Sequence, residues 1–403
     1  MQLSDWKAIS LFSGAGGCSL GFSEAGINII AAYDNAIPAI ETYNINFPGN
    51  KCKNVDLSSC NYSQLRDSLG LKRGELDLII GGPPCQGFTT AGSRFWNDPR
   101  NKLVQNYANA LAEFYPRWFM MENVEGILTT AKGVYVVECI KKMIELGYSV
   151  YLKKVYMQEY AIPQRRKRVI IVGNREGKSF HFPKEKQIAF GSIYREGSDT
   201  LYEAIKDLEG VDIPEIDHVR KSESGIQLER IEYLKVGQSM KDMPERLQNA
   251  SFKRRAFRRV CDGTPSEKRG GAPSGLKRLS YDEPCLTITG SAISEFIHPV
   301  ENRMLTIREC ARVQTFPDNF SFCGTESQKM QQIGNAIPPR FAYQVANSIF
   351  EADKSESQKE PQALISYDVT KATAKSPTLL NTCSMLDGLL PNRYEQIELV
   401  LED

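Results

Sequence analysis

A cysteine in a rigid loop is the first residue that could do chemistry. Cys85 directly follows Gly81-Gly82-Pro83-Pro84. Two prolines hold φ at about −65° and stiffen the loop that presents the thiol. A thiol presented in this way at the end of a strand is a candidate nucleophile, whereas the other nine cysteines are most simply interpreted as structural. The pattern predicts covalent catalysis by Cys85.

A carboxylate and a basic segment could act on the same target. Glu122 begins the tripeptide Glu122-Asn123-Val124 after an apolar stretch, where it could be an acid, a hydrogen-bond partner or a helix cap. Further along, the run QRRKR covers residues 164–168. In an extended segment alternate residues share one face. Gln164, Arg166 and Arg168 could therefore point at one anionic or carbonyl-bearing group, unless the run is only a basic edge strand.

The third pattern is a glycine-rich turn followed by acidic residues, which could bind a ligand. Phe12 is followed by Ser13-Gly14-Ala15-Gly16-Gly17. Glycines permit positive φ and a close approach of the backbone to a ligand. Asp34 ends the next apolar stretch, where it could accept hydrogen bonds from ribose hydroxyls, and Asp56 is a further strand-end acid. The pattern indicates a nucleoside-containing cofactor, with a tight turn as the alternative.

Alternating strands and helices must position these residues. Apolar strands are predicted in the first 175 residues, separated by helical patterns, at 8–12, 29–33, 76–80, 118–121 and 168–172. Such alternation predicts βαβ units and a mostly parallel sheet, in which ligands bind beyond the carboxyl ends of the strands. All the motifs above fall there. Later helices are predicted over 305–316 and 341–350, after a polar, loop-rich stretch.

The composition of the 403 residues limits the class of protein. Hydrophobic residues make up 41% and charged residues 25%, which is typical of globular domains. The longest apolar runs are too short to span a membrane, and the N-terminal residues lack a signal-peptide pattern. Ten cysteines without a CxxC pair, together with three histidines, argue against a zinc site and a disulfide framework. We expect a reduced, cytoplasmic protein without a structural metal.

The net charge of +1 conceals a strongly basic block. Residues 219–280 contain fifteen Lys/Arg and seven Asp/Glu, whereas residues 351–403 contain five Lys/Arg and ten Asp/Glu. Within the basic block, five positive charges fall in seven positions, at Lys253, Arg254, Arg255, Arg258 and Arg259. A basic block in a neutral chain predicts a polyanionic partner, or else a solvated basic surface.

Taken in order, these segments resemble the DNA (cytosine-5) methyltransferases of bacterial type. The resemblance spans about residues 8–350 and is carried by FSGAGG (12–17), NF (46–47), DL (56–57), GGPPCQGF (81–88), RNKL (100–103), ENV (122–124), QRRKR (164–168), RLSYDEPCLTIT (278–289), LTIRECARVQTFPD (305–318) and IGNAIPP (333–339). It implies the α/β, Rossmann-like fold of S-adenosylmethionine-dependent methyltransferases with a smaller, loop-rich target-recognition domain. The implied boundaries are a catalytic domain at 1–185 completed by 325–351, a target-recognition domain and hinge at 186–324, and a tail at 352–403.

The resemblance assigns roles in catalysis and cofactor binding. Cys85 would add to carbon 6 of cytosine, Glu122 would hydrogen-bond N3 and N4, and Arg168 with Arg166 would hold O2 and the surrounding charges. S-adenosylmethionine would be the cofactor, bound by Phe12, Gly14, Gly16, Asp34, Asp56, Leu103 and Asn335. Two departures stand out: Asp34 replaces the glutamate of many members, and MQEYA at 157–161 replaces an NA-DYG pattern.

The resemblance also implies duplex DNA as partner, with the target base flipped out of the helix. Residues 88–99 would form a lid. The cluster of five positive charges at 253–259 would mostly bind phosphate, and the loops at 269–271 and 273–278 would read bases. The implied DNA-binding residues are Gln86, Lys253, Arg254, Arg255, Arg258, Arg259, Arg269, Lys277 and Arg278. A monomer acting separately from a cognate restriction endonuclease is expected.

Three alternatives remain open on the residues alone. An RNA cytosine methyltransferase could use the same scaffold, although the long unmatched stretch at 190–277 favours DNA. A catalytically inactive DNA-binding relative would have lost Cys85, Glu122 or the arginines, all of which are present. A nicotinamide oxidoreductase would explain the glycine turn and Asp34 but not the PPCQ and ENV segments. The tail could be a linker, an accessory helix or a partner-binding segment.

Overall fold

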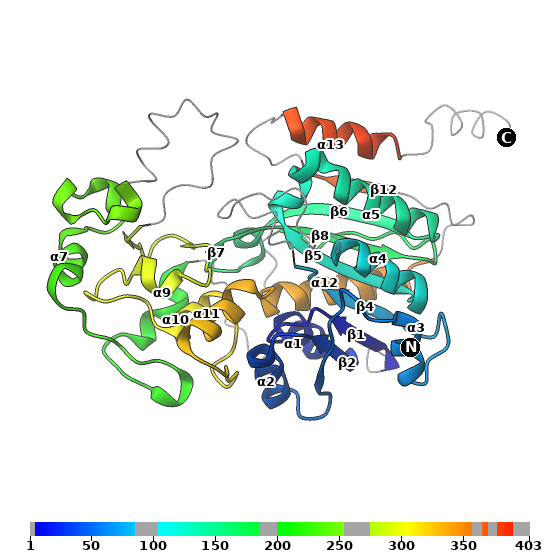
Figure 1. Cartoon of the computed structure of the whole chain (residues 1–403), viewed down its shortest axis with the longest axis horizontal. Helices are drawn as coiled ribbons and strands as arrows, with labels where there is room; N and C mark the ends of the chain where they lie inside the picture. The colour runs from blue at the N-terminus through cyan, green and yellow to red at the C-terminus, as the bar shows by residue number, and fades with distance from the viewer. Residues whose placement is uncertain are drawn as a thin grey trace.

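The computed structural model describes residues 5–84, 103–185, 200–253, 275–356, 365–369 and 377–389. Figure 1 shows a large lobe built around a sheet and a smaller lobe at its side that carries α7, α9, α10 and α11. No helix among the described residues is long and apolar enough to cross a membrane.

The large lobe contains an eight-stranded sheet with the order β12-β6-β8-β5-β4-β1-β2-β3. Within it β8 runs antiparallel to both of its neighbours, and the other pairings are parallel. The strands are β1 (Lys7–Leu11), β2 (Asn28–Asp34), β3 (Cys52–Asn54), β4 (Leu78–Gly81), β5 (Trp118–Val124), β6 (Ser149–Tyr156), β8 (Lys167–Asn174) and β12 (Ile365–Asp368). The five strands expected from the sequence are confirmed to within a few residues, whereas β3, β6 and β12 were not predicted.

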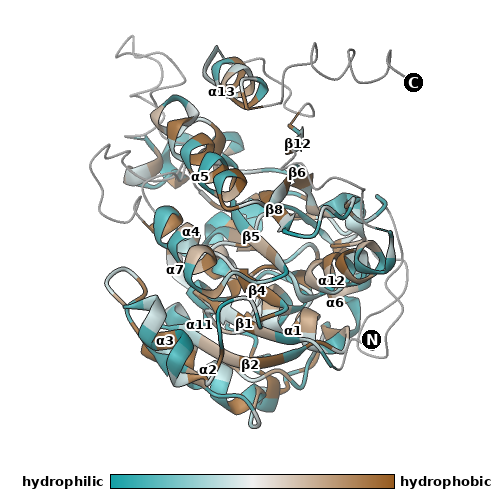
Figure 2. Ribbon diagram, turned by 90° about the vertical axis from the view of Figure 1, so that its right-hand side faces the viewer, coloured by the Kyte–Doolittle hydropathy of each residue, from teal (hydrophilic) through white to brown (hydrophobic). Residues whose placement is uncertain are grey.

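Alternate residues of the strands pack on opposite faces of the sheet, which gives two cores. On one face Ile9 and Leu11 of β1 pack in the core that includes helices α3 (Tyr62–Ser68), α4 (Leu103–Phe114) and α5 (Val134–Glu145). On the other face Ala8 packs in the core that includes α1 (Gly17–Glu24) and α12 (Pro339–Lys354). Figure 2 shows hydrophobic strands between helices whose colouring is mixed. The doubly covered sheet confirms the Rossmann-like α/β prediction.

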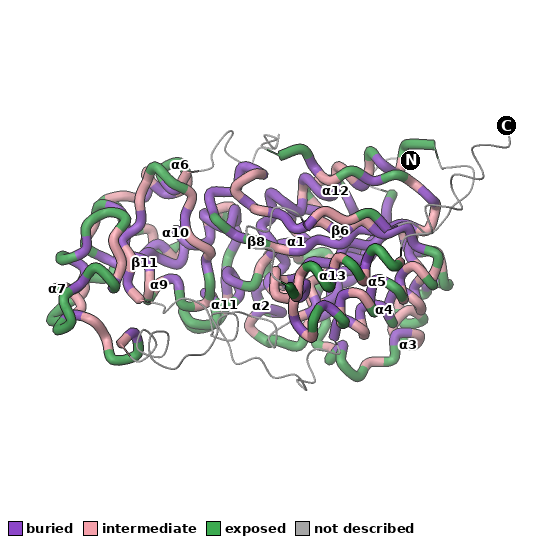
Figure 3. Tube along the Cα trace, turned by 90° about the horizontal axis from the view of Figure 1, so that it is seen from above, coloured by how far each residue is buried: buried purple, intermediate pink, exposed green. Residues whose placement is uncertain are grey.

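The smaller lobe is built from short elements around two cores of its own. One core joins α6 (Leu201–Ile205), α10 (Ile307–Val313) and α11 (Glu326–Asn335), and the second lies beneath α7 (Gly225–Tyr233). Its remaining helices are α9 (Ala292–Glu295) and short 3₁₀ turns at Lys206–Leu208, Pro214–Ile216, Met240–Asp242 and Glu245–Leu247. The short strands are β7 (Gln164–Arg165), β9 (Lys277–Arg278), β10 (Cys285–Leu286) and β11 (Phe296–Ile297). Figure 3 shows that exposed residues predominate along α7, whereas α10 lies deeper.

The segment 325–351, which was expected to complete the catalytic domain, packs in two different hydrophobic cores. Met330 and Ile333 of α11 pack in the small-lobe core, whereas Phe341 and Val345 of α12 pack on the sheet. The helix expected at 305–316 is present as the shorter α10, and the one expected at 341–350 is present as the longer α12. The domain boundaries themselves stay a prediction.

Part of the acidic tail belongs to the large lobe. Residues Ile365–Asp368 form β12, which adds a parallel strand beside β6, and Pro377–Asp387 form α13. Ile365, Val369 and Leu386 are buried in the same core as α4 and α5. Figure 1 shows α13 lying over α5 and the end of the sheet. The tail is therefore more than a linker, and of the alternatives considered the accessory helix is present.

Candidate active site

A cavity of about 670 Å³ lies at the carboxyl ends of β1, β2, β4 and β5. This is the position at which a parallel α/β sheet binds ligands. The wall opposite the strands comes from α11 of the smaller lobe. Eight residues that the sequence analysis predicted for the site line this cavity. They are Phe12, Gly14, Asp34, Asp56, Leu103, Glu122, Arg168 and Asn335.

The glycine-rich turn opens space at the rim of the cavity. Gly14 has φ +53, and a Cβ built there would meet nothing within 4 Å. Phe12 also has a positive φ, of 53, which turns the chain sharply after β1. The left-handed conformation costs an L-residue free energy but costs glycine little. Gly14 therefore adopts it readily, whereas Phe12 must be held in it by the surrounding structure. The result is bare backbone facing the cavity.

Asp34 is held in place by three backbone N–H groups. Its Oδ2 accepts a hydrogen bond from Gly14 N at 2.8 Å, and its Oδ1 accepts from Asn35 N at 2.8 Å and Ala36 N at 2.9 Å. The carboxylate thereby ties the end of β2 to the glycine turn after β1. Each carboxylate oxygen can accept more than one hydrogen bond, so Asp34 can still receive a ligand hydroxyl at the rim.

Asp56 and Leu103 form the adjoining part of the cavity. Asp56 Oδ1 accepts from Ser58 N at 2.9 Å, and the hydrogen bonds from Ser58 lower the pKa of this carboxyl. Asn106 of α4 donates through Nδ2 to the carbonyls of Leu57 at 3.2 Å and Ser58 at 2.9 Å. Helix α4 therefore supplies both a wall residue, Leu103, and the side chain that fixes the Asp56 turn.

Glu122 and Arg168 form a buried ion pair at the base of the cavity. Glu122 Oε1 lies 2.6 Å from Arg168 Nε, and the side chains are 9% and 13% exposed. A Cβ on Gly82 would come within 3.2 Å of Glu122 Oε2, so glycine leaves the carboxylate accessible on that side. An ion pair this enclosed keeps the carboxylate in one orientation.

Asn123 connects this pair to the loop that leads to the predicted nucleophile. Its Nδ2 donates to Pro83 O at 3.2 Å, and its Oδ1 accepts from Val124 N at 2.9 Å. The ends of β4 and β5 are thus tied together beside the cavity. Cys85 and Gln86, and the lid expected at 88–99, lie outside the described residues.

Two residues expected to contact ligand are used in building the site instead. Gly16 does not line the cavity, and a Cβ there would come within 2.6 Å of Phe47 Cε2, so glycine makes room for an aromatic ring. Arg166 is fully buried and donates to the carbonyls of Ile288 at 3.2 Å, Gly334 at 2.8 Å and Ala336 at 2.9 Å. Gln164 points to the same region and bonds Gln314.

The sequence reasoning missed the amide-rich face of α11. Gln328, Gln331 and Gln332 line the cavity beside Asn335, and Gln331 Nε2 donates to Asn335 Oδ1 at 2.9 Å. Their spacing of three and four residues places them on one helical face. That spacing was readable in the sequence, but without the fold it did not show which element the face would meet.

Apart from Gln86, the residues expected to bind DNA fall into three groups. Arg254, Arg255, Arg258, Arg259 and Arg269 lie outside the described residues. Lys253 Nζ lies 3.5 Å from Glu245 Oε1. Lys277 is half-buried on β9. Arg278 is 5% exposed, and its five N–H groups donate to Leu234 O, His298 O, Glu301 O, Ile231 O and Asn302 Oδ1. With all its donors engaged inside the lobe, Arg278 is a structural residue, and we exclude it from the proposed DNA contacts.

Comparison with known proteins agrees with this site. The chain matches the family of C-5 cytosine-specific DNA methylases over residues 6–351. Type II methyltransferase M.FnuDI of Fusobacterium nucleatum is 34% identical over 376 residues, which cover 90% of this chain and 100% of that protein. Type II methyltransferase M1.HphI of Haemophilus parahaemolyticus is 31% identical over 351 residues, covering 86% and 87%.

A solved structure shares the fold. A prophage-encoded protein of Escherichia coli, described as a DNA modification methyltransferase, superposes with a TM-score of 0.64 at 24% identity, covering 87% of this chain and 100% of its own. The family match extends over most of the chain and includes every motif around the cavity. The chain belongs to the C-5 cytosine-specific DNA methylases and is a DNA (cytosine-5) methyltransferase.

Proposed function

We propose that this enzyme methylates carbon 5 of a cytosine that is flipped out of duplex DNA, through a covalent bond between Cys85 Sγ and carbon 6. The observation that carries the proposal is the buried Glu122–Arg168 pair at the base of the cavity. Asn123 ties the strand end that bears this pair to Pro83, two residues before Cys85. The strand end that bears the carboxylate is thus tied to Pro83 after the neighbouring strand β4, and Cys85 follows Pro83 by two residues in the sequence.

The cavity suits S-adenosylmethionine as methyl donor. Its volume falls in the range of roughly 300–1,000 Å³ that is typical of cofactor sites. Asp34, at the end of β2, would accept from the ribose hydroxyls, and Asp56 from the adenine amino group, with Phe12 and Leu103 as apolar walls. Gly14 would admit the methionine part, and Asn335 would lie beside it. When bound, this cofactor supplies an electrophilic methyl group on a positively charged sulfur.

The chain's own residues would make carbon 5 reactive. The thiolate of Cys85 adds to carbon 6, and the electron pair of the 5,6 double bond moves to carbon 5 and into the ring. Glu122 in its protonated form would donate its proton to N3, and its other oxygen would accept from the N4 amino group, which stabilises the ring as charge builds up. Arg168 would hold Glu122 and face O2. The bound cofactor would supply the methyl group to carbon 5, with its methyl–sulfur bond breaking to leave a neutral thioether. Removal of the carbon 5 proton by a base would then return the electron pair that expels the Cys85 thiolate.

The basic block would supply affinity for DNA. Lys253, Arg254, Arg255, Arg258 and Arg259 would bind phosphates, and Gln86, Arg269 and Lys277 would lie closer to the bases. Flipping the target cytosine costs a few kcal/mol of stacking and pairing, which these contacts would offset. By analogy with the Type II methyltransferases that it resembles, we propose that the enzyme protects DNA against a separate restriction endonuclease.

Methylation sequencing tests this proposal. Plasmid DNA from a host that expresses the wild-type chain should carry 5-methylcytosine at one short sequence motif, whereas DNA from a host with Cys85→Ser should carry none. A duplex with 5-fluorocytosine at that motif should form a denaturation-resistant complex with the wild type only, because fluorine cannot leave as the carbon 5 proton does. Methylation by Cys85→Ser would overturn the mechanism, and methylation of transfer RNA but not DNA would reassign the substrate.

The contribution of the basic block can be measured separately. Replacing Arg254 and Arg255 by Ala should weaken DNA binding and flatten its dependence on salt, since each lost phosphate contact reduces the slope of log K against log salt by about 0.9. Glu245→Gln, which frees Lys253 from its 3.5 Å contact, is a useful opposite control and should not flatten the slope. An unchanged slope in the double variant would exclude these arginines from phosphate binding.

A further inference from the structure

We infer that the C-terminal brace, defined as residues 365–369 and 377–389, positions the loop that follows Glu122 and thereby supports catalysis. The brace lies beyond residues 6–351, which match the methylase family. The inference rests on the proposed role of Glu122, and it assigns a function to part of the acidic tail. It concerns a positioning element, since none of these residues lines the cavity.

The loop in question covers residues 125–133 and leaves the cavity directly after β5. It begins with Glu125, which pairs with Lys154 of β6, a lysine whose side chain is only 3% exposed. It ends with Ala131, Lys132 and Gly133, whose φ values are 49, 56 and 84. Three consecutive left-handed residues, two of them with side chains, do not hold this shape unaided. The loop therefore depends on contacts from outside.

Helix α13 supplies those contacts at the far end of the loop. Thr382 Oγ1 donates to Leu128 O at 2.7 Å, and Asn381 Nδ2 donates to Lys132 O at 3.0 Å. Thr382 is 1% exposed, and a Cβ on Gly133 would come within 2.0 Å of its Oγ1. The threonine thus fills the space that the glycine leaves, and the two elements fit together as a pair.

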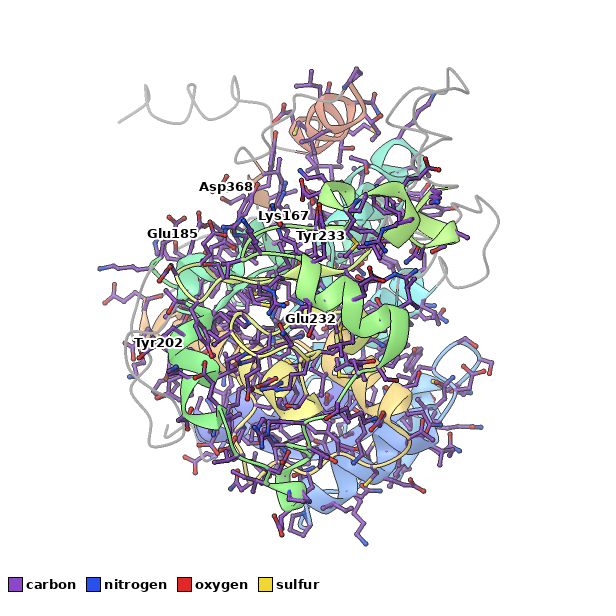
Figure 4. All side chains as sticks on the ribbon, turned by 90° about the vertical axis from the view of Figure 1, so that its left-hand side faces the viewer. Lys167, Glu185, Tyr202, Glu232, Tyr233 and Asp368 are labelled. Atoms are coloured by element: carbon purple, nitrogen blue, oxygen red, sulfur yellow. The ribbon has the colours of Figure 1, made fainter. Side chains whose placement is uncertain are left out.

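The brace is itself fixed to the sheet that carries the reactive residues. Strand β12 pairs with β6 in the register Tyr367↔Leu152 and Asp368↔Lys153, one residue before Lys154. Tyr367 Oη donates to Asp387 at the end of α13, and Leu386 is completely buried in the core. Figure 4 labels Asp368 at the end of β12, the strand that pairs with β6. Both ends of the loop are thereby tied to the same rigid unit.

Glu122 stands three residues before the first of these anchors. Its orientation depends on the course of Asn123, Val124 and Glu125, and Glu125 is held by Lys154 on the strand that β12 covers. If α13 loses its hold on Leu128 and Lys132, the loop relaxes toward ordinary φ values and Glu125 shifts with it. The expected consequence is a lower turnover number with little change in substrate binding.

Thr382→Val tests this inference, because it removes the hydroxyl but keeps the shape of the side chain. We expect kcat to fall about tenfold, less than the roughly hundredfold loss that a 1 Å misplacement of a reactive group can cause. The KM for S-adenosylmethionine and the Kd for DNA should change less than about twofold. Thr382→Ser should restore kcat, since it returns the hydroxyl. Ser384→Ala removes an exposed hydroxyl from the same helix and is the matched control.

The outcomes separate this inference from the proposed function. Activity is measured per folded molecule, at a temperature where unfolding curves show every variant to be native. An unchanged kcat in Thr382→Val, or a change confined to KM, overturns the brace. If Thr382→Val does not fold, Asn381→Ala, an exposed position with one bond to the loop, should still lower kcat, and a wild-type kcat there has the same meaning. Full turnover by Glu122→Gln would instead overturn the proposed role of Glu122.

Discussion

Glu122 and Arg168 lie on neighbouring antiparallel strands, where Arg168 is directly opposite Val124 and Glu122 is opposite Ile170. They meet along the diagonal, which long side chains can span. Two residues earlier, Arg166 lies between β7 and β8 and turns to three backbone carbonyls of other segments. The sequence predicted that such residues would face an anionic or carbonyl-bearing target. It could not show that Arg168 would face the cavity and Arg166 the protein interior, because the carbonyls that Arg166 contacts come from residues more than a hundred positions away.

His298 gives the folded protein a pH dependence that can be predicted at the level of one residue. It is completely buried, and burial lowers its pKa from 6.5 to about 4. Its Nδ1 also accepts from Val300 N at 3.3 Å and Glu301 N at 3.0 Å, bonds that protonation of Nδ1 would remove. The unfolded chain therefore binds this proton at a higher pH than the folded one. Stability should fall as pH decreases from about 6.5 to 4, by up to about 3 kcal/mol.

Urea unfolding at a series of pH values measures this effect. In His298→Asn the free energy of unfolding should be lower at pH 7 but should depend less on pH across that window. His181→Gln, which alters an exposed histidine, should keep the wild-type slope. A wild-type slope in His298→Asn would assign the pH dependence to other groups.

At the scale of elements, α4 links two parts of the active site. Asn106 holds the carbonyls of Leu57 and Ser58, next to Asp56, from the first turns of the helix. Asn106→Ala should loosen this turn and raise the Kd for S-adenosylmethionine about fivefold, which corresponds to roughly 1 kcal/mol for lost hydrogen bonds. At saturating cofactor the turnover number should remain close to that of the wild type.

Isothermal titration calorimetry checks this expectation without a need for turnover. Glu113→Ala is the matched control, since Glu113 lies at the other end of the same helix and pairs with Arg66. Equal cofactor affinity in Asn106→Ala and the wild type would show that the turn at Asp56 keeps its conformation without the hydrogen bonds from Asn106.

The elements that the sequence predicted share a clear local signal. Strands 8–12, 29–33 and 76–80 are apolar runs that are followed by Ser13-Gly14, by Asp34 and by Gly81. Strand β6 was missed because Lys153 and Lys154 interrupt its apolar pattern, and Lys154 is buried only because Glu125 pairs with it. Strand β12 is four residues long within a polar tail, and it exists as a strand because β6 offers it an edge. Both depend on partners from distant parts of the chain.

At the scale of the whole molecule, Arg166 is a direct connection between the lobes. It lies between β7 and β8, where the chain passes from the small lobe into the large-lobe sheet, and it bonds Ile288 of the small lobe together with Gly334 and Ala336 at the end of α11. Arg166→Gln should lower the free energy of unfolding by about 2 kcal/mol, because buried carbonyls lose charged donors. It should also increase cleavage between the lobes in limited proteolysis.

Guanidinium unfolding and timed proteolysis measure the two effects. Arg165→Gln is the matched control, since Arg165 is exposed and pairs with Glu283 at the surface, and it should change neither quantity appreciably. If Arg166→Gln and Arg165→Gln behave alike, the interlobe bonds contribute nothing measurable.

The packing of α1 against α12 sets the order in which the protein can be completed during synthesis. Phe22 of α1 packs in one core with Phe341 and Val345, and a Cβ on Gly21 would come within 2.2 Å of Pro339 O. More than three hundred residues leave the ribosome between the two helices, and the part of the sheet face that α12 covers stays exposed for all that time. Contacts so distant in sequence form late and slowly. The cofactor-binding end of the sheet therefore gains its full support only after α12 has left the ribosome, so that a chain stalled before that point carries the reactive motifs without a finished enzyme around them.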